Sequence, residues 1–314
     1  MKRRFYKGVA AALGGALLWG FSGNCIQALT GGSGFDPLLI TLVRAIVAAF
    51  ALLGASFIRY RSALGGIWRD GKARLWIGMF GIALFLSQGT YAISVEHTNA
   101  GTATVLQSLA TVFVLAITCI MGRRLPRKLE VVGLACAVLS TWLIATQGDP
   151  LTLSLPLGGV LWGLVNALSV AVYLVCPQRL YERWPSIPVI ASGVAASAGF
   201  AILVYGAKMA LAGDAAIPLL DTGDMLLLVG GIGLLGTACA FGLYLYGVSI
   251  VGSVNGSLLG TAEPASAMVI MVLWLGTAVS VADWLGLVLM MGMIVAVAKG
   301  APEPEEAAKD ARTS

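Results

Sequence analysis

Hydrophobic residues in this chain fall into ten long runs separated by short polar segments. A helix needs about 20 apolar residues to cross the hydrocarbon core of a bilayer, and each run is roughly that long. Prolines lie in or beside the intervening segments, where helices begin or end. The pattern predicts an all-α integral membrane protein with ten transmembrane helices, at residues 8–28, 37–58, 75–95, 100–121, 129–146, 157–177, 187–212, 224–249, 252–276 and 281–298.

Composition indicates the same class. Hydrophobic residues make up 58% of the chain and charged residues 11%, and the mean hydropathy is +0.90. Soluble domains carry about 25% charged residues. The formal charge of +5 comes from Lys and Arg clusters between apolar runs, so we expect no nucleic-acid partner. The expected partners are the lipid bilayer and a small-molecule substrate, and the oligomeric state stays open, with a monomer plausible.

The basic residues also predict the topology. The N-terminus, the second, fourth and sixth loops and the C-terminal tail together hold 18 of the 20 Lys and Arg residues. The alternate loops have none and carry acidic residues instead. Cytoplasmic loops collect Lys and Arg, so we expect a multi-pass protein of the cell inner membrane with both termini cytoplasmic. Of the Lys and Arg residues, only Arg44 and Lys208 fall inside predicted spans.

A short motif occurs twice along the chain. Residues 14–21 read GGALLWGF, and residues 158–164 read GGVLWGL. A weaker echo relates the segments 90–101 and 243–256, each of which leads from a tyrosine through small residues into an apolar run. The offsets, 143 residues for the tryptophans and 153 for the tyrosines, are about half the chain. Internal repeats of this kind are typical of transporters.

Five spans in each half mean that the first span and its copy cross the membrane in opposite directions. We therefore predict two inverted five-helix repeats, residues 1–150 and 151–299, followed by a disordered cytoplasmic tail at 300–314 that is rich in Glu, Ala and Pro. Inverted repeats place a substrate site near the bilayer midplane at their interface, with access alternating between the two sides.

The repeated Trp-Gly, the five-plus-five arrangement and the segment AEPASAMVIMVLWLG at 262–276 resemble the drug/metabolite transporter superfamily, in particular its EamA-like branch. The chain length and short cytoplasmic loops are similar to those of the YddG-type aromatic amino-acid exporters. This resemblance implies export of aromatic or apolar amino acids and related small metabolites. The first half departs from the pattern, because Thr111-Val112 stands where the second half has Glu263-Pro264.

Two ionisable residues within spans are candidates for function, because a charge at the bilayer centre costs several kcal/mol. Arg44 and Glu263 are predicted to lie at similar depths. They either form a structural contact between spans two and nine, or Arg44 clamps a substrate carboxylate. Glu263 has three possible roles: structural partner, proton-coupling site or substrate contact. Pro264 lacks an amide donor and leaves the Gly260 carbonyl unpaired, so both residues are predicted to form a hinge.

Neutral polar residues recur at helical spacing, as in the pairs Gln88 with Tyr91, Gln107 with Thr111, and Trp162 with Asn166. Such stripes either line a cavity of mixed aromatic and amide character or form hydrogen bonds between helices. The complete predicted substrate site comprises Trp19, Asn24, Arg44, Gln88, Tyr91, Gln107, Thr111, Trp162, Asn166 and Glu263.

Other function classes find less support in the sequence. The chain has no HExxH, GxSxG or Walker lysine motif, so we expect neither an enzyme nor a cofactor. Its single histidine, His97, excludes a histidine-rich metal site. The main alternative is efflux of cationic drugs, which favours an acidic, aromatic cavity without a carboxylate clamp. A channel or lipid-handling protein is a further alternative. Unlike a carrier, such a protein would not show counterflow.

Overall fold

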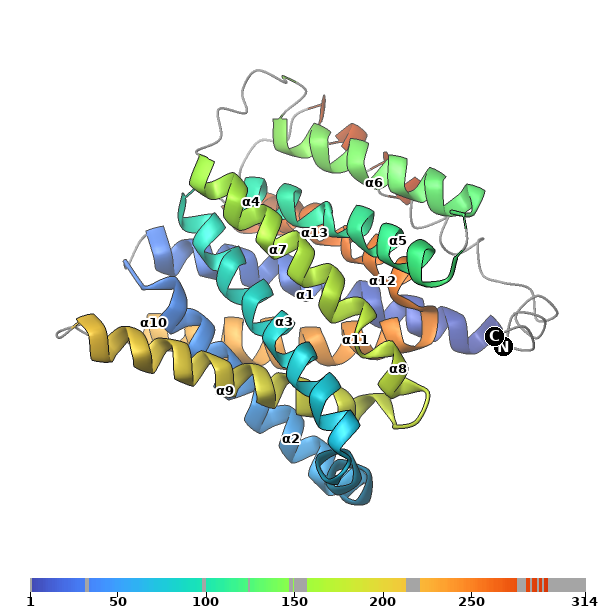
Figure 1. Cartoon of the computed structure of the whole chain (residues 1–314). Coiled ribbons are helices and arrows are strands. Elements are labelled where there is room, and N and C mark those ends of the chain that lie inside the picture. Colours follow the sequence, from blue (N-terminus) through green and yellow to red (C-terminus); the bar gives the residue numbers. More distant parts are fainter. Residues whose placement is uncertain are drawn as a thin grey trace.

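The computed structural model describes residues 2–31, 34–97, 100–123, 125–146, 149, 157–212, 221–275, 281–282, 284–286, 288–289 and 291–292. Within these ranges the chain is all-helical and has no strand, as the sequence predicts (Figure 1). The elements are α1 (Lys2–Gly31), α2 (Pro37–Arg69), α3 (Gly71–His97), α4 (Ala100–Ser108), α5 (Ala110–Met121), α6 (Lys128–Thr146), α7 (Leu157–Val175), α8 (Gln178–Tyr181), α9 (Ser186–Ala212), α10 (Thr222–Met225), the π-helical η1 (Leu226–Cys239), α11 (Ala240–Val251), α12 (Ser253–Gly260) and α13 (Ala262–Leu275).

Among the described residues, six helical stretches are long and apolar enough to cross a membrane. They are Arg3–Thr30, Pro37–Arg69, Gly71–His97, Leu157–Tyr181, Ser186–Leu211 and Thr222–Val251, and they confirm six of the predicted spans. The predicted span 129–146 coincides with α6. Much of the predicted span 281–298 and all of the tail 300–314 lie outside the described residues. The count of ten helices therefore stays a prediction.

Large apolar side chains cover the outside of these helices. Phe50 is 75% exposed, Ile58 is 87% exposed and Leu203 is 69% exposed. Helices that leave such side chains uncovered are stable where the surrounding solvent is itself apolar, as in the hydrocarbon core of a bilayer.

Helices from the two halves of the sequence pack against one another. α1 contacts α11 and α13, whereas α7 contacts α3, α4 and α5, and α2 lies beside α9 (Figure 1). The repeated Trp-Gly motif provides the close approach in both places. A Cβ atom on Gly20 would lie 2.6 Å from the amide nitrogen of Ala267 in α13. A Cβ atom on Gly163 would lie 2.7 Å from the Cβ of Leu106 in α4.

Two of the predicted spans are interrupted. The predicted span 100–121 divides into α4 and α5 at Leu109, and the predicted span 252–276 divides into α12 and α13 at Thr261. At each interruption a backbone amide bonds three residues back, from Leu109 to Leu106 over 3.2 Å and from Thr261 to Leu258 over 3.3 Å. The second interruption lies beside Pro264, but no proline or glycine stands near the first.

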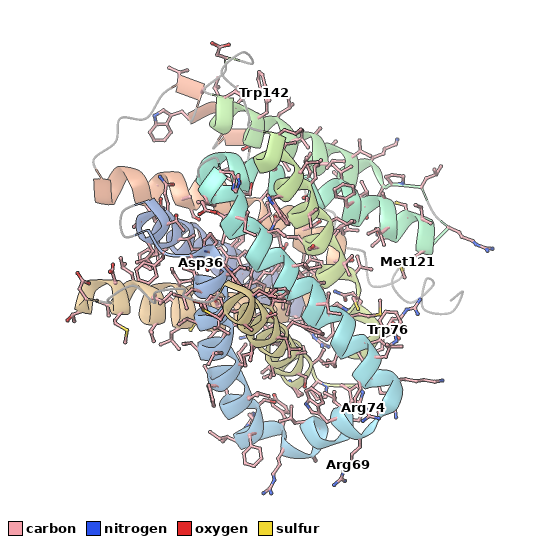
Figure 2. The ribbon with its side chains drawn as sticks, turned by 60° about the vertical axis from the view of Figure 1, so that its left-hand side comes forward. Asp36, Arg69, Arg74, Trp76, Met121 and Trp142 are labelled. Carbon is pink, nitrogen blue, oxygen red and sulfur yellow. The ribbon has the colours of Figure 1, made fainter. Side chains whose placement is uncertain are left out.

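Ion pairs tie α2 to the second half of the chain at both ends of the bundle. Lys208 Nζ lies 2.6 Å from Asp36 Oδ2, and Arg183 Nη1 lies 2.6 Å from Asp70 Oδ2. Figure 2 shows Asp36 at the opposite end of α2 from Arg69. Each carboxylate also caps a helix, since Asp36 accepts a hydrogen bond from an amide at the start of α2 and Asp70 does the same for α3.

Candidate substrate site

Seven helices converge on a small cavity near the middle of the bundle. Arg44 of α2 and Glu263 of α13 both face it, as do aromatic and amide side chains from the other helices. We call it the first cavity; it is lined by Trp19, Ser22, Gly23, Ile26, Arg44, Ser87, Gln88, Tyr91, Gln107, Tyr173, Phe241 and Glu263. Its volume is about 30 Å³. That space holds a water molecule or two and is too small for an amino acid.

A second cavity of about 30 Å³ adjoins the first and shares four of its lining residues, Trp19, Gln107, Tyr173 and Glu263. Its remaining lining residues are Thr104, Ser108, Ala110, Thr111, Val170, Leu174, Tyr244, Ser257, Gly260, Thr261 and Pro264. Both helix interruptions therefore border this second cavity.

Arg44 is buried, with 4% of its surface exposed, and lies against η1. Its Nε donates a hydrogen bond to the hydroxyl of Thr237 over 2.9 Å. Thr237 in turn donates to the carbonyl of Ile232, five residues earlier, in the register of a π-helix. No other hydrogen bond of the Arg44 guanidinium is found among the described residues. Its terminal nitrogens therefore keep their capacity to bind a carboxylate.

Glu263 is buried as well, with 5% of its surface exposed, and its partner is Gln107 rather than Arg44. The Gln107 side-chain amide donates a hydrogen bond to Glu263 Oε2 over 2.9 Å. In the described part of the chain, Arg44 and Glu263 form no ion pair with each other. The structural contact between them, one of the two predicted alternatives, is not formed as a direct ion pair here, and the roles of both residues stay predictions. Two opposite charges share one cavity without neutralising each other directly.

Several polar groups in the first cavity are also without partners. Three buried atoms form no hydrogen bond within the described ranges: the side-chain amide nitrogen and oxygen of Gln88 and the indole nitrogen of Trp19. Buried polar groups are normally hydrogen-bonded, and an unsatisfied one costs about 1–3 kcal/mol. Tyr91 differs, because its hydroxyl lies 3.2 Å from that of Thr104. The unsatisfied groups suit a ligand that supplies both donors and acceptors.

Aromatic rings form the apolar side of the site. Trp19 packs against Phe241 and Tyr244, with ring centroids 4.8 and 4.4 Å apart. Tyr173 lies 5.8 Å from Phe241. Aromatic surface next to charged and amide groups is typical of pockets that bind ligands with a polar head and an apolar body.

Seven of the ten predicted substrate residues line these cavities: Trp19, Arg44, Gln88, Tyr91, Gln107, Thr111 and Glu263. Gly260 and Pro264, the predicted hinge, line the second cavity. The other three predicted residues, Asn24, Trp162 and Asn166, line neither cavity, and the structure gives a reason for each.

Asn24 is half-buried and donates its amide to the carbonyl of Gly20 in its own helix over 3.0 Å. Asn166 is buried and donates to the carbonyl of Ser87 in α3 over 2.6 Å, so it joins two helices behind the cavity. Trp162 is 39% exposed. It lies on the same stripe of α7 as the cavity residue Tyr173, eleven residues further on, but at a different level of the bundle.

The sequence prediction missed other residues of the site. Tyr173 and Phe241 had signals in the sequence, because Tyr173 continues the polar stripe of α7 and Phe241 precedes the repeated Tyr244 by one helical turn. Thr237 had no such signal, since its contact with Arg44 depends on the π-helical register of η1. Among the described residues, no group of three or more His, Cys, Asp or Glu side chains is arranged to hold a metal ion.

Known proteins are similar to this chain in sequence and in fold. The chain is 29% identical to the uncharacterized inner membrane transporter YicL of Salmonella typhimurium over 292 residues, which cover 93% of this chain and 95% of YicL. It is 22% identical to an uncharacterized transporter of Archaeoglobus fulgidus over 268 residues, 84% of this chain and 87% of that one. A protein of known crystal structure has a TM-score of 0.73 at 19% identity, over 92% of this chain and 95% of its own, and so shares the fold.

The profile of the EamA-like transporter family matches two segments, residues 6–146 and 157–298. Together they cover most of the sequence, including every residue that lines the two cavities. The chain is a membrane transporter that belongs to the EamA-like transporter family.

Proposed function

We propose that this transporter exports amino acids with an aromatic or apolar side chain, and related small zwitterions, across the inner membrane. The proposal rests chiefly on Arg44 and Glu263, two opposite charges that line one aromatic cavity without pairing with each other. The name of the relative YicL supports the choice of membrane.

A zwitterion matches this arrangement group by group. The planar guanidinium of Arg44 binds a carboxylate through two hydrogen bonds, and Glu263 accepts the ammonium group. Gln88 provides both a donor and an acceptor for the polar head. An apolar or aromatic side chain then packs on Trp19 and Phe241.

Transport by alternating access requires the cavity to change size. An amino acid needs far more space than 30 Å³, so the surrounding helices must separate to admit it. The interruptions at Leu109 and Thr261 border the second cavity and are the places where the helices bend most readily. We assign the hinge of the second half to Gly260 and Pro264.

Two inverted five-helix repeats, residues 1–150 and 151–299, would supply this mechanism. The two segments matched by the family profile, 6–146 and 157–298, coincide with these halves. Gly20 packs on the interrupted span of the second half, whereas Gly163 packs on that of the first half. This exchange is what an in-plane pseudo-twofold axis produces. With an even number of spans, the Lys and Arg distribution favours cytoplasmic termini.

Counterflow in proteoliposomes tests the substrate. Vesicles loaded with unlabelled phenylalanine are diluted into labelled phenylalanine, phenethylamine or phenylpropionate, which are the zwitterion, the molecule without a carboxylate and the molecule without an ammonium group. We expect saturable counterflow of phenylalanine and at least tenfold weaker uptake of the other two compounds. The proton gradient is then varied to test coupling.

Other outcomes distinguish the alternatives. Preference for phenethylamine would indicate a cation-efflux carrier, in which Glu263 and the aromatic rings form the site and Arg44 has a structural role. Uptake that neither saturates nor shows counterflow would indicate a channel and would overturn the alternating-access proposal.

A further inference from the structure

A third, much larger hollow lies on the outside of the bundle, where α2, α3 and α9 meet. Its volume is about 440 Å³, compared with 30 Å³ for each central cavity. We call it the lateral groove; it is lined by Trp68, Arg74, Ile77, Gly78, Ala196, Gly199, Phe200, Ile202 and Leu203. Pockets of a few hundred Å³ accommodate whole small molecules.

Two glycines form the space. α3 and α9 touch at Gly81, where a Cβ atom would lie 3.0 Å from the amide nitrogen of Ser197. At Gly78, one turn before Gly81, and at Gly199, two residues after Ser197, a Cβ atom would meet nothing within 4 Å. The helices thus cross closely at one point and leave a gap beside it. Any larger side chain at Gly78 or Gly199 would enter the groove.

The groove is apolar except at one position. Arg74 is the only charged residue among the described residues that line it. Within the described residues, the Arg74 side chain has no hydrogen-bond or ion-pair partner. Trp68 stands at the same end of the bundle and is 43% exposed. Tryptophan and arginine at the edge of an apolar surface are typical of the depth at which lipid headgroups lie.

The surroundings of Arg74 are positively charged. Figure 2 shows Arg69 and Arg74 close to each other, at the end of the bundle predicted to be cytoplasmic. Lys72 adds a third cation, and the one carboxylate of this turn, Asp70, is already bound to Arg183. Anionic lipids of the cytoplasmic leaflet are attracted to such segments.

We propose that the lateral groove binds one phospholipid with an anionic headgroup. An acyl chain lies along Gly78, Gly199 and Phe200, and the headgroup phosphate accepts hydrogen bonds from Arg74. A second copy of the chain is the less suitable occupant. A twofold contact would bring Arg69 and Arg74 of one copy close to the same residues of the other, and these like charges would repel each other.

Native mass spectrometry of the full-length protein in detergent tests this assignment. The protein is titrated with phosphatidylglycerol or phosphatidylcholine that carry identical acyl chains. We expect phosphatidylglycerol to bind roughly five-fold more tightly, the contribution of about one arginine near a membrane surface. Arg74→Gln should remove most of this preference, whereas Lys72→Gln, in the same turn but outside the groove, should retain most of it.

Filling the groove provides an independent test. Gly199→Leu should weaken binding of both lipids, while Gly206→Leu, at an equally open and exposed position of the same helix, should leave both unchanged. Gly78→Leu repeats the test from α3 if Gly199→Leu does not fold. Equal binding of the two lipids to the wild-type protein, or equal effects of Arg74→Gln and Lys72→Gln, would overturn the proposal. A dimer that dissociates on Gly199→Leu would identify a second copy as the occupant and overturn it as well.

Discussion

Gln107 donates its amide to the carboxylate of Glu263 over 2.9 Å and so joins α4 of the first half to α13 of the second half across the cavity. Glu263→Gln keeps a carbonyl that accepts this hydrogen bond, but it removes the negative charge. We therefore expect a folded protein whose affinity for phenylalanine falls about tenfold or more, since hydrogen bonds to charged groups contribute roughly 1.5–3 kcal/mol. Counterflow measures the affinity, and the melting temperature confirms folding. The control is Glu96→Gln at an exposed position; unaltered affinity in Glu263→Gln would exclude an ammonium site.

The hydrogen bond from Arg44 to Thr237 predicts that the hydroxyl of Thr237 orients the guanidinium. Thr237→Val removes this hydroxyl at nearly constant volume, so we expect the KM for phenylalanine to rise about five- to tenfold with a small change in stability. Arg44→Lys should impair uptake further, because an ammonium group lacks the planar fork. Thr118→Val is the matched control, since among the described residues the Thr118 hydroxyl bonds only within its own helix. An unchanged KM in Arg44→Lys would contradict the carboxylate clamp.

Gly260 leaves room for the hydroxyl of Tyr244. A Cβ atom at position 260 would lie 2.6 Å from this oxygen, which donates a hydrogen bond to the carbonyl of Gly256. Gly260→Ala should therefore lower stability by about 1–3 kcal/mol. Combining it with Tyr244→Phe removes the clashing atom and should recover part of that loss, as measured by thermal unfolding in detergent. Additive destabilisation in the double variant would show that the two sites act independently.

Asp70 provides a dependence on pH outside the membrane. Hydrogen bonds from the Ala73 and Lys72 amides, together with the nearby Arg183, hold the pKa of Asp70 below its usual value. A lowered pKa in the folded state means that the stabilisation is present above about pH 4 and is lost as the pH falls through the lowered pKa. The difference in melting temperature between wild type and Asp70→Asn should stay constant from pH 8 to pH 5 and shrink in stronger acid. Arg183→Gln should cost less stability, because it removes only the ion pair and leaves the charged carboxylate that accepts both amide hydrogen bonds.

The predicted topology is open to a labelling test. In a cysteine-free background, Asp149→Cys and Asp221→Cys should react with an impermeant thiol reagent from outside intact cells. Lys72→Cys and Arg127→Cys should react only after the membrane is permeabilised. All four positions are exposed, so differences in labelling report sidedness rather than burial. Reaction of the second pair in intact cells would reverse the assigned orientation.

The sequence predicted those features that depend on local physical chemistry. Apolar length fixed the six long helices, and the cost of burying a charge identified Arg44 and Glu263 as cavity residues. Helical spacing likewise identified Gln88, Tyr91 and Gln107, because residues three and four apart share one face of a helix.

Features that depend on tertiary packing were not predictable in this way. The interruption at Leu109 has no proline or glycine beside it and became evident only with the fold. A stripe on a helix also does not specify depth, so Trp162 was expected in the site where Tyr173 lies. The repeated Trp-Gly motif was interpreted through its tryptophans, whereas the feature common to both copies is the close helix contact made at the glycines.

The two ion pairs at the ends of the bundle have a consequence for how the halves recognise each other. Both carboxylates, Asp36 and Asp70, belong to the first half, and both cations, Arg183 and Lys208, belong to the second half. Two copies of the first half, arranged as the halves are here, would oppose aspartate with aspartate at both ends, and two copies of the second half would oppose cation with cation. Like charges disfavour both self-pairings. On the proposed two-repeat arrangement, we therefore expect these charges to favour association of a first half with a second half over either self-pairing, including when the halves are supplied as separate polypeptides.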